Sequence, residues 1–271
     1  MSTLLGIHGV WQYHRDRTAD VLAGMWRGYL QEGVRPVREV DLAAVYYSPL
    51  LRDQGTPQGT DDEVPDALAG DVDAWLRALG APNPTMHGAV ATGRLRDGIA
   101  WVAQRYGLDQ KLTRLFVRAF FAEVARYLDP LDRTRHDAVL GEVLHALHTH
   151  RPRVVVAHSL GSVVAFEALH ADPGVEVELL LTLGSPLGMP DVVLDKLDPG
   201  PVAGRLTKPP GVRRWVNVAD RGDIIAIPRP LSSVVDGIDV DLEPSIHAFD
   251  FHQARNYLRN PTTVAALAPY L

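Results

Sequence analysis

The segment RVVVAHSLGSVVAFEAL, residues 153–169, carries the strongest structural signal in the chain. A β-branched apolar run stops at Ala157, His158 and Ser159, and a helical pattern begins directly after it. This order predicts a strand, a tight turn that presents Ser159 at the carboxyl edge of a sheet, and a helix whose N-terminus faces the serine. Small residues are needed two positions before and after the serine, because the backbone folds back on itself there, and Ala157 and Gly161 meet that need. The segment therefore predicts a serine held as a candidate nucleophile.

Short apolar runs elsewhere in the chain alternate with longer helical patterns, which is typical of a parallel sheet with crossover helices. The stretch 231–242 alternates apolar residues with aspartates, so it is either a sixth strand at a sheet edge or a loop. The predicted fold class is α/β, with a mostly parallel central sheet flanked by helices. The five predicted core strands are 3–7, 37–47, 154–157, 179–183 and 214–218.

Two regions depart from this alternation. Residues 51–66 are polar and rich in turn formers, which predicts an exposed loop. From about 66 to 128, helical patterns follow one another with no strand between them. A helical insertion of this kind either packs on the core or forms a lid over a hydrophobic site, since its apolar face has to be buried. One such face is formed by Leu112, Leu115, Phe116, Ala119, Phe120, Val124 and Leu128.

Composition limits the classes of protein to which the chain can belong. Its 271 residues, 46% of them hydrophobic, predict one large globular domain over 1–271, with 51–130 as a helical insertion within it. The absence of cysteine excludes thiol nucleophiles, disulfides and iron–sulfur clusters. A net charge of −6 argues against nucleic acid as a partner. With no positively charged leader and no long apolar run, we expect neither export nor a transmembrane segment, and thus a cytoplasmic protein.

Together with the serine segment, several further stretches resemble the α/β-hydrolase superfamily, and more closely its lipase- and esterase-like serine hydrolases. The resemblance covers about two thirds of the chain and includes Ala157, where glycine is commoner in the family. It implies an α/β-hydrolase fold in which residues 51–130 form a variable helical cap or lid. The similar stretches are LLGIHGVW at 4–11, LLTLGSPLGM at 180–189, RRWVNVADRGDIIA at 213–226 and FHQARNYLRNP at 251–261.

Members of this superfamily place serine, acid and histidine in that order along the chain, and this sequence can do the same. The acid would be Asp223, just before the apolar stretch IIAIP, with Asp220 as the alternative. The base would be His252, which precedes a helical pattern as in the family's histidine loop, with His247 as the alternative. The carboxylate is needed to hold the imidazole in the tautomer that accepts the proton of Ser159.

The resemblance also implies an oxyanion hole built from backbone N–H groups. One would come from Leu160, directly after the candidate nucleophile, and the other from the loop that contains Gly9, Val10 and Trp11. The side chains of Val10 and Trp11 would then shape the pocket and take no part in the reaction.

Other conspicuous polar residues favour structural interpretations. His145, His148 and His150 do not share one helical face, so we expect no metal site there, and no cofactor. Ser185 has no small residue two positions before it and is followed by proline, which favours a strand-ending turn.

The sequence thus predicts a cofactor-independent serine hydrolase acting on a small hydrophobic carboxylic ester. A thioesterase, an amidase or peptidase, or an acyltransferase would use the same residues. An alternative of another class is a binding module that keeps the fold without catalysis. Nothing in the sequence indicates the oligomeric state.

Overall fold

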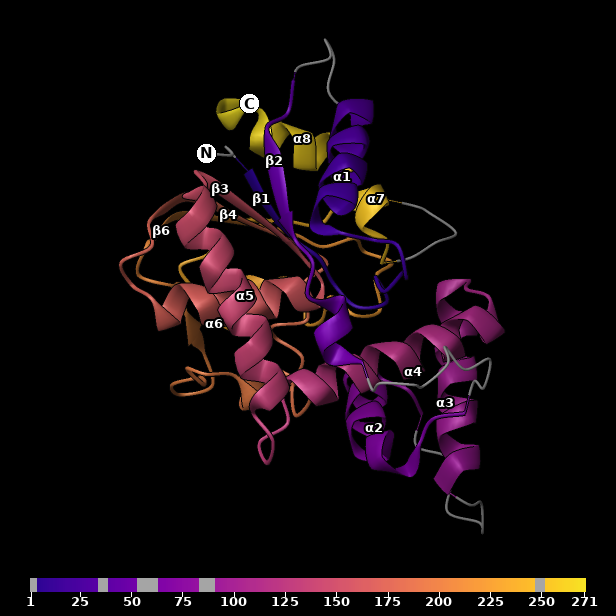
Figure 1. Cartoon of the computed structure of the whole chain (residues 1–271). Coiled ribbons are helices and arrows are strands. Elements are labelled where there is room, and N and C mark those ends of the chain that lie inside the picture. Colours follow the sequence, from indigo (N-terminus) through magenta and orange to yellow (C-terminus); the bar gives the residue numbers. More distant parts are fainter. Residues whose placement is uncertain (1–3, 34–38, 53–62, 83–90, 247–251) are drawn as a thin grey trace.

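A computed structural model of the chain describes residues 4–33, 39–52, 63–82, 91–246 and 252–271. Figure 1 shows the helices and strands of these ranges. The strands are β1 (Leu4–Ile7), β2 (Leu42–Val45), β3 (Val154–His158), β4 (Val177–Leu183), β5 (Leu206–Thr207), β6 (Val212–Val218), β7 (Val235–Asp236) and β8 (Val240–Leu242). The α-helices are α1 (Ala19–Gly33), α2 (Ala69–Ala78), α3 (Ala91–Tyr106), α4 (Gln110–Tyr127), α5 (Thr134–His150), α6 (Leu160–Ala171), α7 (Ala254–Leu258) and α8 (Pro261–Leu267). Strand–helix–strand units occur at β1-α1-β2 and β3-α6-β4.

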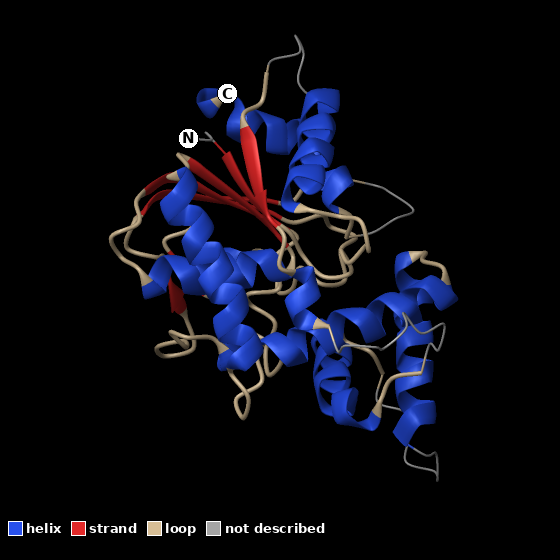
Figure 2. Cartoon of the chain, in the orientation of Figure 1, coloured by secondary structure: helices blue, strands red, loops and turns tan. Residues whose placement is uncertain are grey.

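Six strands form the central sheet in the order β2-β1-β3-β4-β6-β8, and every neighbouring pair in it is parallel. Helices flank this sheet, as Figure 2 shows, so the predicted α/β architecture with a parallel sheet is confirmed. Strands β5 and β7 form a separate two-stranded pair. Because all six strands run in one direction, the turns that follow β1, β3 and β6 lie at one edge of the sheet.

The strands are apolar on both faces because both faces are covered. In β3, Val154 and Val156 pack into a cluster that contains Trp26 of α1, whereas Val155 and Ala157 pack into the cluster formed with α5 and α6. All four β3 side chains are fully buried. The continuous apolar runs in the sequence reflect this two-sided burial.

The prediction of an edge strand over 231–242 is confirmed only for β8, at the end of the sheet. The remainder forms a 3-10 turn at Leu231–Ser233 and the strand β7, which pairs with β5. The aspartates that made this stretch ambiguous bond to neighbouring segments. Asp239 accepts a hydrogen bond from the Trp215 N–H (2.8 Å), and Asp241 accepts one from the Asn217 side chain (2.8 Å).

Helices α2, α3 and α4 follow one another, as predicted, with no strand between them in the described residues 63–82 and 91–127, and they lie together in Figure 1. In α4 the side chains of Phe116, Phe120, Phe121 and Val124 are buried, while Leu112 at the start of the predicted apolar face is 56% exposed. Of the predicted loop over 51–66, residues 53–62 lie outside the described part of the chain. None of the helices in the described ranges is both long and apolar enough to cross a membrane.

Candidate active site

Ser159 occupies the sharp turn between β3 and α6. Its backbone has φ 55° and ψ −129°. Residues other than glycine rarely adopt this conformation, so the backbone of Ser159 is strained. The Ser159 N–H donates to the Leu183 carbonyl oxygen of β4 (3.0 Å), which holds the turn against the sheet. Helix α6 begins at the next residue, Leu160, so its N-terminal N–H groups lie beside the serine. The predicted strand, turn and helix are all present.

Two glycines allow the chain to pass close to this turn. A Cβ on Gly161 would lie 2.3 Å from the Ile7 carbonyl oxygen and 2.4 Å from that of His8. A Cβ on Gly9 would lie 2.4 Å from the Cβ of Ser159. The loop after β1, residues 8–11 and here called the β1 loop, therefore runs directly past the candidate nucleophile.

The structure brings Ser159, His252 and Asp223 together in one series of hydrogen bonds. The Oγ of Ser159 lies 2.6 Å from Nε2 of His252, and Nδ1 of His252 lies 2.7 Å from Oδ2 of Asp223. All three residues are buried. With the Asp223 carboxylate accepting from Nδ1–H, Nε2 is left as the acceptor for the serine proton. This is the arrangement that general-base activation of a serine requires.

Asp223 is held as a carboxylate. Burial alone would raise its pKa, but the adjacent His252 and the hydrogen bonds from His252, Tyr257 and the Ile225 N–H together lower the pKa to about 2. The Ile225 N–H donates to Oδ1 (2.8 Å), while the Tyr257 hydroxyl donates to Oδ2 (2.7 Å), the same oxygen that faces His252. The carboxylate therefore stays ionised and fixed beside the imidazole.

Asp220, the alternative acid, makes hydrogen bonds to other residues and none to His252 is among them. Its Oδ1 accepts a hydrogen bond from the Ile246 N–H (2.9 Å), and its own N–H donates to the Tyr257 hydroxyl (2.9 Å). Asp220 thus fixes the segment that leads toward the histidine. His247, the alternative base, lies outside the described residues.

Tyr257 is a component of the site that the sequence analysis missed. Its buried hydroxyl bridges the Asp220 N–H and the Asp223 carboxylate, and burial together with the charge of Asp223 raises its pKa well above the ordinary value. A buried tyrosine hydroxyl usually requires a hydrogen-bond partner, but no sequence pattern identifies that partner.

The β1 loop is pinned by its histidine. Nδ1 of His8 donates to the Gly9 carbonyl oxygen (2.6 Å), and Nε2 accepts the Tyr47 N–H (3.2 Å). The Tyr47 hydroxyl in turn donates to the His8 carbonyl oxygen. Burial lowers the pKa of His8 to about 4, so this imidazole remains neutral near pH 7.

Of the predicted oxyanion-hole residues, Trp11 has its N–H already bonded. It donates to Oε1 of Glu123 on α4 (3.1 Å), and Trp11 itself has φ 59°. Leu160 stands at the N-terminus of α6, and Val10 is buried in the β1 loop.

Aromatic side chains from α4 cover the imidazole. The rings of Phe116 and Phe120 meet His252 edge-on, with centroids at 5.4 Å and 6.3 Å. Trp11 lies 6.2 Å from Phe116 and is 42% exposed. The surroundings of the candidate base are therefore apolar, with partly exposed apolar side chains at their margin.

The polar residues given structural interpretations are not members of this series. The Ser185 hydroxyl lies 2.8 Å from the Ser162 hydroxyl, which is itself 2.6 Å from the Ser159 carbonyl oxygen, so Ser185 supports the turn from behind. On α5, His148 pairs with Asp172 (2.9 Å). Within the described ranges, no three histidine or acidic side chains are grouped so that they could hold a metal ion.

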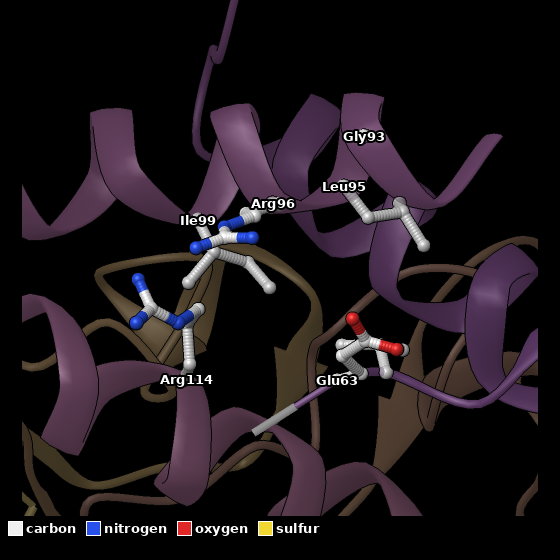
Figure 3. A pocket seen from close by; sticks show the side chains of 7 residues that line it. Glu63, Gly93, Leu95, Arg96, Ile99 and Arg114 are labelled. Atoms are coloured by element: carbon white, nitrogen blue, oxygen red, sulfur yellow. The ribbon is translucent and has the colours of Figure 1, made fainter. Parts of the chain in front are cut away.

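A separate small cavity of about 150 Å³ lies at α3 and α4. Figure 3 shows the side chains of Arg96 and Arg114 directed toward it, together with Glu63 and the aliphatic side chains of Leu95 and Ile99. Its lining includes neither Ser159 nor His252.

Comparison of the chain with models of protein families found no match, and comparison with curated proteins found none either.

Proposed function

We propose that this chain is a cofactor-independent serine hydrolase of the α/β-hydrolase fold that cleaves a carboxylic ester. The observation that carries the proposal is the series of hydrogen bonds from Ser159 through His252 to Asp223. The strained backbone of Ser159 at the start of α6 supports it, because the turn holds the hydroxyl above the sheet edge in a fixed orientation.

In the proposed reaction, the Ser159 hydroxyl oxygen attacks the ester carbonyl carbon while Nε2 of His252 takes the hydroxyl proton. Collapse of the tetrahedral intermediate breaks the bond to the leaving oxygen, which receives that proton from His252, and an alcohol departs. Water then attacks the acyl-enzyme, His252 takes its proton, and the acid leaves as the proton returns to Ser159. Asp223 stays ionised throughout and stabilises the imidazolium.

The negative oxygen of the tetrahedral intermediate would be bound by the Leu160 N–H and by the Val10 N–H of the β1 loop. The Trp11 N–H is assigned no such role, since it donates to Glu123. The N-terminal end of α6 adds a favourable dipole at the same place.

The apolar part of the substrate would lie beneath α2, α3 and α4, the helices that we propose as the cap over 51–130 in a single domain. Phe116 and Phe120 carry this assignment, because their rings pack on the candidate base itself. An acyl or alcohol group lodged there would exclude water from the reacting atoms.

A fluorophosphonate probe tests the proposal, because it reacts with activated serines. We expect stoichiometric labelling of the wild type, no labelling of Ser159→Ala, and unchanged labelling of the control Ser233→Ala, which changes an exposed serine. Wild-type protein that is folded and unlabelled would contradict the proposal and favour the non-catalytic binding module.

A panel of nitrophenyl esters, from short to long acyl chains, then defines the substrate. Faster turnover of the longer chains would support an apolar group beneath the proposed cap. Parallel thioester and amide substrates separate an esterase from a thioesterase or amidase, and an added alcohol acceptor detects acyl transfer.

A further inference from the structure

The two carboxyl oxygens of Glu123 on α4 differ in their surroundings near the candidate active site. Its Oε1 accepts the Trp11 N–H, 112 residues earlier in the chain (3.1 Å). Its Oε2 is buried and has no hydrogen-bond partner among the described residues. A buried carboxyl oxygen without a hydrogen-bond partner lowers the stability of the fold. The presence of a glutamate at this position is therefore not explained by stability alone.

Trp11 needs an external hydrogen bond to hold its conformation. At φ 59° its backbone lies in the left-handed region, which is costly for a bulky side chain. The peptide between Val10 and Trp11 is planar, so a bond to the Trp11 N–H fixes that unit, including the Cα of Val10. The Val10 N–H is attached to this Cα on the adjoining peptide, which is restrained in turn. Two residues earlier, Gly9 already touches Ser159. The Glu123 bond therefore sets the path of the chain immediately beside the candidate nucleophile.

We propose that Glu123 is a positioning residue, which ties α4 to the β1 loop through the Trp11 N–H and so holds the Val10 N–H where the oxyanion forms. The inference rests on the proposed function and extends it. The oxyanion hole would be complete only when α4 is packed against the β1 loop. Glu123 itself contacts no reacting atom in this scheme.

The charge of Glu123 is set by groups on several elements. Burial raises the pKa of its carboxyl to about 7. The hydrogen bond from the Trp11 N–H, and the charges of Arg126 on α4 and of Arg52 after the 3-10 turn Ser48–Leu51, lower the pKa by less than burial raises it. The pKa of the nearby Tyr47 hydroxyl is raised by burial and, to a smaller extent, by the charge of Glu123. A carboxyl oxygen accepts the Trp11 N–H in either protonation state, and more strongly when ionised.

Substitutions at Glu123 separate the hydrogen bond from the charge. Glu123→Gln keeps an acceptor for the Trp11 N–H, and we expect its kcat to stay within about threefold of the wild type. Glu123→Ala removes the acceptor, and we expect kcat to fall about 10- to 100-fold with KM within about twofold, as for a weakened oxyanion hole. The matched control, Glu142→Ala on the exposed surface of α5, should leave both constants unchanged. If Glu123→Ala does not fold, Glu123→Asp replaces it, since its shorter side chain withdraws the carboxyl from Trp11.

The backbone amide signal of Trp11 in NMR spectra provides a readout independent of turnover. It should titrate near pH 7 in the wild type and lose that titration in Glu123→Gln. A labelled, active wild type whose kcat is unchanged in folded Glu123→Ala or Glu123→Asp would overturn this inference alone. A wild type that neither labels nor hydrolyses esters would overturn the proposed function, and this inference with it.

Discussion

Tyr257 donates to the Asp223 carboxylate that orients His252, so the Tyr257→Phe variant isolates one hydrogen bond within the site. We expect kcat to fall about 10- to 150-fold with KM nearly unchanged, because a hydrogen bond to a charged group contributes about 1.5–3 kcal/mol. Steady-state kinetics and the rate of fluorophosphonate labelling measure the loss. The control is Tyr270→Phe, whose half-buried ring lies under Arg153 and outside the Ser159–His252–Asp223 series. Equal kcat in both variants would contradict a supporting role for Tyr257.

Individual residues differ in how far the sequence identifies them. Ser159 follows from a local motif, and Asp223 and His252 follow from the order that the family resemblance implies. Tyr257 and Glu123 act across 34 and 112 residues, and such contacts leave no periodic pattern. They become visible only when the folded chain brings their segments together.

At the level of elements, the close approach of α6 to the end of β1 depends on Gly161. We expect Gly161→Ala to abolish labelling of Ser159 and to destabilise the fold by several kcal/mol, because the added Cβ would lie 2.3 Å from a backbone oxygen. Gly28→Ala in α1 is the matched control, since a Cβ there meets nothing within 4 Å. It should raise stability by up to about 1 kcal/mol, in thermal unfolding and in urea. Normal labelling in Gly161→Ala would show that the two elements can separate at no cost.

Helices α4, α5 and α6 meet at a buried polar cluster centred on Glu167. Its Oε2 accepts a hydrogen bond from the Tyr127 hydroxyl (2.5 Å) and lies 3.2 Å from Nε2 of His136, while Oε1 accepts the Asp198 N–H (2.9 Å). The cluster ties the helix that follows Ser159 to α4, and so to the proposed cap.

We expect Tyr127→Phe to lower the free energy of unfolding by about 1–3 kcal/mol, because a buried carboxyl oxygen of Glu167 loses a hydrogen-bond partner. Glu178→Gln, which breaks an exposed pair with Arg153, should lower the free energy of unfolding by much less than Tyr127→Phe does, because solvent screens the pair. Urea unfolding of both variants measures the difference. Equal, small effects would mean that the cluster does not bind these helices together.

Strands and helices could be predicted from the sequence where the pattern of buried residues along them is regular. Strands covered on both faces read as apolar runs, so β1, β3, β4 and β6 were predicted nearly at their true bounds. The stretch 231–242 could not be resolved in the same way, because its aspartates bond to Trp215 and Asn217 in the neighbouring strand. Its short edge strand depends on those tertiary contacts more than on local preference.

For the whole molecule, two buried groups give the stability opposite dependences on pH. The pKa of His8 is lowered to about 4, so the unfolded state binds a proton first, and stability present above pH 6.5 is lost as pH falls toward 4. The pKa of Glu123 is raised to about 7, so the folded state binds the proton first, and stability is gained as pH falls from 7 toward 4.5.

The two contributions are of similar size, about 3 kcal/mol each by the shift in pKa, and should partly cancel in the wild type. We expect Glu123→Gln to lose stability more steeply than the wild type between pH 7 and 4.5, and His8→Gln to lose it less steeply. Urea unfolding at a series of pH values tests this, with His145→Gln on the exposed face of α5 as the control. If the free energy of unfolding changed with pH at the same rate in the wild type and all three variants, the roles given to His8 and Glu123 would be wrong.

The candidate base stands 93 residues after the serine that it faces, on the segment that leads into α7. During translation, β1, β3 and the turn at Ser159 leave the ribosome well before His252 is joined to the chain. A nascent chain therefore carries the serine without the imidazole that accepts its proton. Any acylating activity of the proposed kind would arise only after synthesis has passed that histidine.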